Sequence, residues 1–372
     1  DIRPYHDDEI NPALKRIISN PAFDKILDFF LPHEDKDKIK DLLSEIKSAH
    51  SFQKKFVYQL IKSIISKSSS GLTCNGIDNL NPGTPYLFIS NHRDIVLDSA
   101  ILQMLLVDYG HDTTEISFGS NLMINPFVVD LGKANRMFRV IRGGSSRELL
   151  KNSQLLSAYI RNTIVNKQTS VWIAQRQGRT KNGNDKTETG LLKMLNMSGG
   201  GNPEESFRQL NIVPCAISYE YEPCCALKIK ELISVSLTGT YHKQPNEDLN
   251  SIITGITQKK GRIQITAGPA VSHYPDQLKN EVSVNGKINI MAGIIDTAIY
   301  NNYRLWPNNY IAWELLNHSQ RFGEYYTSDD KIKFLEYMEA ETGGLEGDRK
   351  IINDIFLGIY ANPVSNYLNL NR

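Results

Sequence analysis

The chain has 372 residues, 40% hydrophobic and 22% charged, which are ordinary values for a soluble globular protein and exclude long disorder or a fibrous chain. Lysine and arginine number 42 against 41 aspartate and glutamate, and the resulting net charge of +1 excludes a globally basic nucleic-acid binder. The longest apolar run, residues 99–107, is too short for a membrane-spanning helix. The length corresponds to about two or three domains with a large core.

The N-terminal residues lack the charged and apolar segments of a signal peptide. Four cysteines are present and form no Cys-x-x-Cys pair, which predicts free thiols in a reducing, cytoplasmic compartment. Nothing in their surroundings predicts a nucleophilic thiol. We expect neither a metal site nor a resident cofactor. The cysteines are Cys74, Cys215, Cys224 and Cys225.

Apolar residues in the first 80 positions recur at spacings of three and four, which predicts helices. From about residue 85 the pattern changes to short apolar strands that alternate with helices, one of which, 145–166, opens with a Ser145-x-x-Glu148 capping box. Residues 286–372 return to helical patterns with many aromatic side chains. The expected strands are 85–90, 115–119, 138–141, 170–175, 212–219, 230–236 and 261–267.

This alternation predicts an α/β fold with a mostly parallel or mixed central sheet flanked by helices. An N-terminal helical cap and a helical C-terminal region would complete the chain. We therefore predict three parts: a cap at 1–80, the α/β core at 81–285, and a C-terminal region at 286–372 packed on the core.

The first segment that could carry chemistry runs from Ser90 to Asp98, where a strand ends and a helix begins. That junction places His92 at the carboxyl edge of the sheet. Either Asp94, in the first helical turn, or Asp98, further along, could bind one ring nitrogen and leave the other free to accept a proton. A simple helix cap beside a surface histidine would explain the same spacing.

Two further segments carry arginines where strands end. Arg139 and Arg142 precede a Gly-Gly pair that permits close approach of an anion to the next helix N-terminus. Arg176 and Arg179 enter a polar loop, and guanidinium groups suit bidentate contact with phosphate. Solvated surface arginines are the alternative for both segments. A fourth segment, 212–219, is an apolar strand suited either to an acyl-chain wall or to the core.

Taken in order, the four segments resemble the sequence blocks of the glycerol-phosphate and lysophosphatidate acyltransferase family, and residues 178–192 are similar to its bacterial glycerol-3-phosphate acyltransferase branch. The family's Asn-His-x4-Asp block corresponds to Asn91, His92 and Asp98, and the resemblance covers about residues 85–225. The spacing here is His-x5-Asp, so an irregular first turn is expected, with Asp94 as the alternative partner. The other matching residues are Phe138–Arg142 of the second block, Gln177, Gly178 and Arg179 of the third, and Val213 and Pro214 of the fourth.

The third block departs from the family, because Gln177 stands where the family has glutamate. A glutamine keeps hydrogen bonding but loses a charge, which leaves two roles open for the position. Either it supports the base or orients an arginine, so that activity is reduced here, or it is structural.

The resemblance implies an O-acyltransferase of phospholipid synthesis that moves a fatty acyl group from a thioester to a hydroxyl of glycerol 3-phosphate or 1-acyl-glycerol 3-phosphate. His92 would be the general base, an aspartate would orient it, and Arg142 and Arg179 would hold the phosphate. The donor would be a coenzyme A or acyl-carrier-protein thioester, used as co-substrate. Arg139, Arg176, Gln177 and Gly178 complete the expected substrate-binding set.

Two alternatives remain from the sequence. The chain could be a degenerate, non-catalytic phospholipid-binding relative, or an acyltransferase for a different amine or alcohol. Convergence of Arg142 and Arg179 near His92 would favour a phosphorylated acceptor. Candidate residues for an acyl groove, each equally suited to the core, are Met123, Phe127, Val128, Val129, Met194, Leu195 and Met197.

Charge is unevenly distributed along the chain. Residues 133–193 hold thirteen basic and three acidic residues, a net of 13 − 3 = +10, whereas residues 321–354 hold five basic and nine acidic ones, a net of 5 − 9 = −4. The basic span includes the predicted phosphate-binding arginines. We therefore expect a cytoplasmic protein that associates peripherally with an anionic phospholipid surface, the inner face of the cell membrane.

Overall fold

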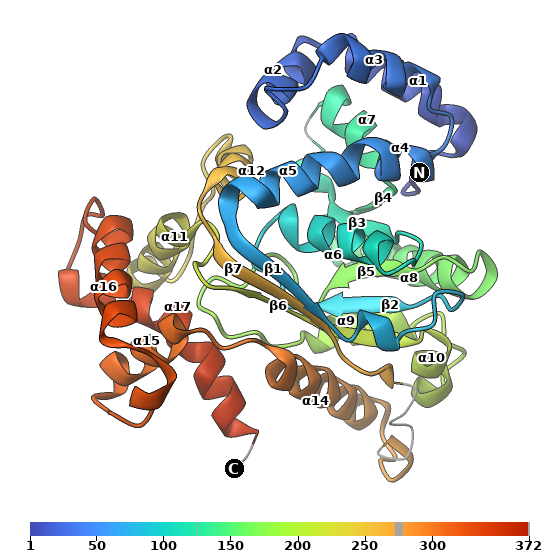
Figure 1. The fold of residues 1–372 in the computed structure, drawn as a ribbon. Coiled ribbons are helices and arrows are strands. Elements are labelled where there is room, and N and C mark those ends of the chain that lie inside the picture. Colours follow the sequence, from blue (N-terminus) through green and yellow to red (C-terminus); the bar gives the residue numbers. More distant parts are fainter. Residues whose placement is uncertain (124, 272–277, 371–372) are drawn as a thin grey trace.

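The computed structural model describes residues 1–123, 125–271 and 278–370. Seven strands of this described part form one mixed sheet in the order β1-β7-β6-β2-β5-β3-β4 (Figure 1). Neighbouring strands run parallel except β6 and β7, which are antiparallel. The strands are β1 (Ser69–Asn75), β2 (Leu87–Ser90), β3 (Glu115–Gly119), β4 (Met137–Val140), β5 (Val171–Ala174), β6 (Ile212–Tyr219) and β7 (Gly261–Ala267).

Helices precede, interrupt and follow the sheet. Before it come α1 (Asp7–Ile18), α2 (Pro21–Phe30), α3 (Lys36–Glu45), α4 (Ala49–Phe52) and α5 (Tyr58–Ser68). Between strands lie α6 (Leu97–Asp108), α7 (Pro126–Ala134), α8 (Ser146–Arg161), α9 (Thr189–Asn196), α10 (Pro203–Gln209), α11 (Cys225–Thr238) and α12 (Glu247–Thr257). After β7 come α14 (Val284–Asn302), α15 (Pro307–Asn317), α16 (Ser328–Thr342) and α17 (Arg349–Asn369).

The central strands β2 and β6 are buried at every residue, as expected for strands covered on both faces. Alternation along β2 sends Phe88 to one face and Leu87 and Ile89 to the other. The Phe88 face packs against α5 and α6, and the opposite face packs against α8, α9, α10 and α14. Figure 1 shows α6 and α14 on opposite sides of the sheet. The sheet is therefore the middle layer of a helix–sheet–helix sandwich, and the predicted fold class is confirmed.

Two further apolar clusters lie outside this sandwich. One joins the N-terminal helices α1 to α4 with α7, and the other joins α11 with α15, α16 and α17. Cluster membership crosses the predicted boundaries, because β1 belongs to the sheet and α11 packs with the C-terminal helices. The division at residues 80 and 285 stays a prediction.

Most predicted elements fall within two residues of the observed ones, and the Ser145–Glu148 capping box is present. Two predictions were wrong. Residues 69–75, expected within the helical cap, form β1 at the edge of the sheet. Residues 230–236, expected as a strand, lie within α11, where Leu232 and Ile233 pack with the cluster formed by α15 to α17 and Val235 is exposed.

Candidate active site

The carboxyl ends of β2, β3, β4 and β5 meet at one edge of the sheet because these strands are parallel. In open α/β sheets this edge is where ligands bind. The loop after β2 carries His92, the turn after β4 carries Arg142, and the loop after β5 carries Arg176 and Arg179. All four residues line a single cavity with about 670 Å³ of empty space, so the structure brings the predicted base and arginines together.

His92 is paired with Asp98. The ring Nδ1 lies 2.8 Å from Oδ2 of Asp98, whose side chain is fully buried, while the His92 side chain is 14% exposed. An ionised carboxylate only accepts hydrogen bonds, so Nδ1 is the donor and Nε2 of the neutral ring is the acceptor. The ring also lies edge-to-face with Trp172, with centroids 5.8 Å apart. This is the geometry of a histidine oriented as a general base.

Further donors hold the Asp98 carboxylate in place. Its Oδ2 accepts from the backbone N–H groups of Arg93, at 2.6 Å, and Asp94, at 3.0 Å. Its Oδ1 accepts from the Tyr219 hydroxyl at 2.8 Å. Because each of these donors comes from buried backbone or side chain, the carboxylate has one well-defined orientation toward His92.

Asp94 has a different role in the structure. Its Oδ1 accepts from the backbone N–H groups of Val96, at 2.9 Å, and Leu97, at 2.8 Å, so it caps the start of α6. Its Oδ2 is buried and has no hydrogen-bond partner. Burial, with the nearby negative charge of Asp98, raises the pKa of Asp94. Of the two predicted carboxylates, Asp98 contacts the imidazole.

The irregular turn expected from the His-x5-Asp spacing is present. Residues 91–96 have no helical hydrogen-bonding pattern, and α6 begins only at Leu97. The additional residue is therefore absorbed in the loop, and Asp98 sits in the first turn of the helix where its side chain reaches back to His92.

A buried charged cluster beneath this loop was not predicted. The Arg93 guanidinium pairs with Asp185, at 2.6 Å, and with Glu222, at 3.0 Å, and Lys228 pairs with Glu222 at 2.5 Å. Lys228 also donates to the backbone carbonyl of Arg93 at 2.8 Å. Side chains in the cluster are at most 3% exposed. Three segments that are distant in sequence, at Arg93, at Asp185 and at residues 222–228, meet here, so no local spacing could have indicated the whole cluster.

The cavity beside His92 is strongly basic. Besides its three arginines it is lined by Lys181 and Lys243, with Asp248 as its one acidic lining residue in the described part of the chain. The two lysines are paired, Lys181 with Glu231 at 2.7 Å and Lys243 with Asp248 at 2.5 Å. Nε of Arg176 and one terminal nitrogen of Arg179 are buried without a hydrogen-bond partner. The positive charge of the lining fits an anionic ligand.

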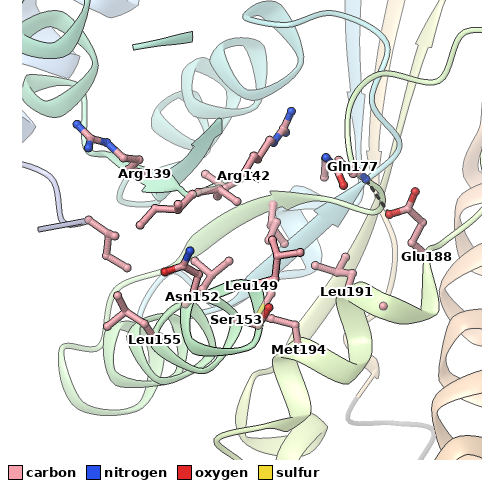
Figure 2. Close-up of a pocket in the computed structure, with 18 of the residues that line it drawn as sticks. Arg139, Arg142, Leu149, Asn152, Ser153, Leu155, Gln177, Glu188, Leu191 and Met194 are labelled. Atoms are coloured by element: carbon pink, nitrogen blue, oxygen red, sulfur yellow. Dashed lines mark hydrogen bonds between the residues drawn. The ribbon is translucent and has the colours of Figure 1, made fainter. Parts of the chain in front are cut away.

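A second, larger cavity opens beside the first and has about 1160 Å³ of empty space. Both cavities share Arg142 and Arg176 as lining residues. Figure 2 shows Leu149 and Leu155 from α8 and Leu191 and Met194 from α9 along this cavity. Its lining is therefore largely aliphatic away from the arginines.

The remaining predicted substrate-binding residues divide between the two cavities. Gly178 lines the His92 cavity, whereas Arg139 and Gln177 line the larger one. The Gln177 backbone N–H donates to Oε2 of Glu188 at 3.0 Å, which is the dashed contact in Figure 2. Among the residues proposed for an acyl groove, Met194 lines the larger cavity, whereas Leu195 is core and Phe127 packs with the N-terminal helices.

Comparison with known proteins agrees with this geometry. Residues 71–218 match the family model described as Acyltransferase. The match spans β1 to β6 and includes His92, Asp98 and the arginines of both cavities. The family resemblance seen in the sequence is confirmed.

A solved structure of a 1-acyl-sn-glycerophosphate (LPA) acyltransferase from Thermotoga maritima is similar over 76% of this chain and 92% of that one, with 11% identity and a TM-score of 0.38. No curated protein sequence gave a significant match. Within the described residues, no helix combines the length and apolar character needed to cross a bilayer.

Proposed function

We propose that the protein is an O-acyltransferase of phospholipid synthesis. It would transfer a fatty acyl group from a coenzyme A or acyl-carrier-protein thioester to a hydroxyl of glycerol 3-phosphate or 1-acyl-glycerol 3-phosphate. The observation that carries the proposal is that two cavities adjoin at the sheet edge. One is lined by His92, which is paired with Asp98, and by three arginines, and the other is largely aliphatic. The family match supports the acyl-transfer chemistry.

His92 acts as the general base in this proposal. Its Nε2 takes the proton of the acceptor hydroxyl as the oxygen attacks the thioester carbonyl carbon. The tetrahedral intermediate collapses with cleavage of the C–S bond, and the imidazolium returns the proton to the departing thiolate. Asp98 stabilises the imidazolium that forms between these steps. The products are an ester and a free thiol.

Direct transfer without an acyl-enzyme intermediate fits the cysteines of this chain. Cys215, Cys224 and Cys225 are buried, and burial raises the pKa of each thiol. A raised pKa makes the thiolate scarce at neutral pH, which is the opposite of what a nucleophilic cysteine needs.

The arginines set the acceptor class. Arg142, Arg176 and Arg179 place several donors beside His92, and a phosphate dianion can accept from more than one guanidinium. Arg179 lines the same cavity as His92, and we assign it as a phosphate-binding residue. The aliphatic cavity would take the acyl chain. The arrangement favours a phosphorylated alcohol over a neutral alcohol or an amine.

Release of free thiol from an acyl thioester, measured on the purified protein with a panel of acceptors, tests the proposal. We expect turnover with glycerol 3-phosphate or its 1-acyl derivative and little with glycerol. His92→Ala should lower kcat about 10²- to 10⁴-fold. Arg179→Gln should raise KM for the phosphorylated acceptor far more than it lowers kcat.

Three outcomes would overturn parts of this proposal. Unchanged turnover in a folded His92→Ala variant would remove His92 as the base. Equal use of phosphorylated and neutral acceptors would remove the phosphate assignment. Tight lipid binding without thiol release would instead identify a non-catalytic phospholipid-binding relative.

We also propose that the protein works in the cytoplasm at the inner face of the cell membrane, where such acceptors lie. The support is the basic span 133–193, which contains the cavity arginines.

A further inference from the structure

The start of α8 projects from the molecule. Every residue from 141 to 151 is exposed, covering the end of β4, its turn and the first helical turns. The inner face of α8 becomes buried only at Ser157 and Ile160. Gly143 and Gly144, in the turn between β4 and α8, have φ values of +83° and +108°, a backbone region that favours glycine. We name residues 141–155 the α8 edge.

Large aliphatic side chains on the α8 edge lie uncovered. Leu150 is 52% exposed, Leu155 50%, Leu149 43% and Ile141 39%. Such a group in one short segment is unusual for a protein surface, where single apolar residues are scattered. Leu149, Leu155 and Ile141 also line the larger cavity, and Figure 2 shows both leucines on its α8 side. The uncovered apolar strip is thus continuous with the mouth of that cavity.

The α8 edge is also cationic. Arg147 and Lys151 are exposed and one helical turn apart, flanking the two leucines. The one acid in the edge, Glu148, has its Oε2 bound by the N–H and hydroxyl of Ser145, both at 2.8 Å. Leucines beside basic residues on an exposed helix are the pattern of a segment that lies in the interface of an anionic bilayer.

One exposed apolar residue on another helix, Ile332, lacks these features. Ile332 on α16 is 56% exposed, but it belongs to the acidic span 321–354 and lines none of the described cavities at the sheet edge. Figure 1 shows α16 and α8 on opposite sides of the molecule. Ile332 therefore provides a matched control.

We propose that the α8 edge is the surface by which this protein docks on an anionic lipid bilayer, with Leu149 and Leu150 inserted among the acyl chains. Arg147 and Lys151 contact the headgroup phosphates. Docking in this orientation places the mouth of the larger cavity against the membrane, so that a chain can pass between bilayer and cavity. This last consequence rests on the proposed function, whereas the docking itself does not.

Co-sedimentation with vesicles tests the docking. Phosphatidylcholine vesicles with and without phosphatidylglycerol are mixed with wild type, Leu150→Glu and Arg147→Gln/Lys151→Gln, none of which alters a cavity-lining residue. We expect preference for phosphatidylglycerol, a partition coefficient at least tenfold lower for Leu150→Glu, and about fivefold lower for each cation removed. Ile332→Glu and Lys38→Gln/Lys47→Gln, which alter exposed residues far from the edge, should bind like wild type.

Thiol release with a water-soluble acceptor and short-chain thioester separates docking from catalysis. Variants that lose vesicle binding but keep this turnover support both proposals. If the wild type shows no turnover but binds vesicles, and the variants lose that binding, the proposed function is overturned and the docking is supported. Wild-type-like vesicle binding by Leu150→Glu overturns the docking. The docking is also overturned if these variants bind acidic acyl-carrier protein more weakly than the wild type does while their vesicle binding is unchanged.

Discussion

The Tyr219 hydroxyl donates to one oxygen of Asp98 while the other oxygen of that carboxylate contacts His92. Tyr219 lies at the end of β6 and is 1% exposed, so the sheet itself fixes the hydroxyl. The proposed base is therefore oriented through two buried groups, the Asp98 carboxylate and the Tyr219 hydroxyl. The Asp98 carboxylate thus connects Tyr219 on β6 with His92 in the loop after β2.

Replacing Tyr219 with phenylalanine tests this relationship. The change leaves Oδ1 of Asp98 buried without its donor, so the free energy of unfolding should fall by about 1–3 kcal/mol. We expect kcat for thiol release to fall with little change in KM, because Tyr219 is buried and lines neither of the two cavities at the sheet edge. Urea denaturation and steady-state kinetics give the two quantities.

Tyr58→Phe is the matched control. The Tyr58 hydroxyl donates to Asp108 at 2.5 Å, but this pair lies at the surface, where water replaces the lost partner. Its stability and turnover should match wild type. Equal effects of both changes would contradict the role of Tyr219.

The isosteric pair Asp98→Asn and Asp94→Asn separates the two carboxylates of the first block. Asp98→Asn should lower kcat by at least 10²-fold, because an amide at this position supports the wrong tautomer of His92 and cannot stabilise the imidazolium. Asparagine caps helices as well as aspartate does, so Asp94→Asn should retain the α6 cap and most activity. Parallel steady-state kinetics with circular dichroism as a folding control distinguish them, and a larger loss from Asp94→Asn would reverse the assignment.

The location of His92, Arg142 and Arg179 at the sheet edge could be predicted from the sequence, because the order of strand, loop and helix places all three where strands end. Spacing alone left Asp94 and Asp98 open, because both side chains can reach His92 from the same helix start, and the family resemblance favoured Asp98 with Asp94 as the alternative. Only the backbone path of residues 91–96 distinguishes them. The ion pairs of Arg93 with Asp185 and Glu222 could not be predicted from local sequence patterns, because the three residues come from separate loops that meet only in the folded protein.

The two wrong elements have a similar cause. A strand at the edge of the sheet such as β1 has only one neighbour, and its exposed polar residues hide the alternation that marks inner strands. In α11 the short apolar run around Ile233 fits strand and helix patterns equally well. Its packing against the C-terminal helices, which are distant in sequence, decides the outcome.

Gly255 of α12 approaches the Asp94 carboxylate so closely that a Cβ atom there would lie 2.0 Å from Oδ2. Alanine in a helix interior normally stabilises by about 1 kcal/mol relative to glycine. Gly255→Ala should instead destabilise and should lower turnover, because displaced Asp94 carries with it the N–H bound by Asp98.

Gly358→Ala serves as the control, since a Cβ at this α17 position meets nothing within 4 Å and should raise stability by about 0.5–1 kcal/mol. Thermal denaturation of both variants measures the contrast. A stabilised, fully active Gly255→Ala variant would show that the contact is not required.

Lys260 is a buried ammonium whose effect on stability depends on pH. Burial lowers its pKa from 10.5 to about 8, although Asp94 acts in the opposite direction, and its Nζ donates to the carbonyls of Ile256 and Gln258 at 3.1 and 2.6 Å. Between pH 8 and 10.5 the unfolded chain therefore binds a proton that the folded protein has released. The free energy of unfolding contributed by this group must rise with pH across that window, by about 3 kcal/mol in total.

Lys260→Met removes this titration. Below pH 8 the folded wild type bears the cost of the buried charge, so the variant should be the more stable protein at pH 7. The free energy of unfolding of the wild type, measured by urea denaturation at each pH, should increase steadily relative to that of the variant from pH 8 to 10.5. A stability difference that is constant over this range would show that Lys260 titrates normally, and a difference that moves in favour of the variant would reverse the sign of the argument.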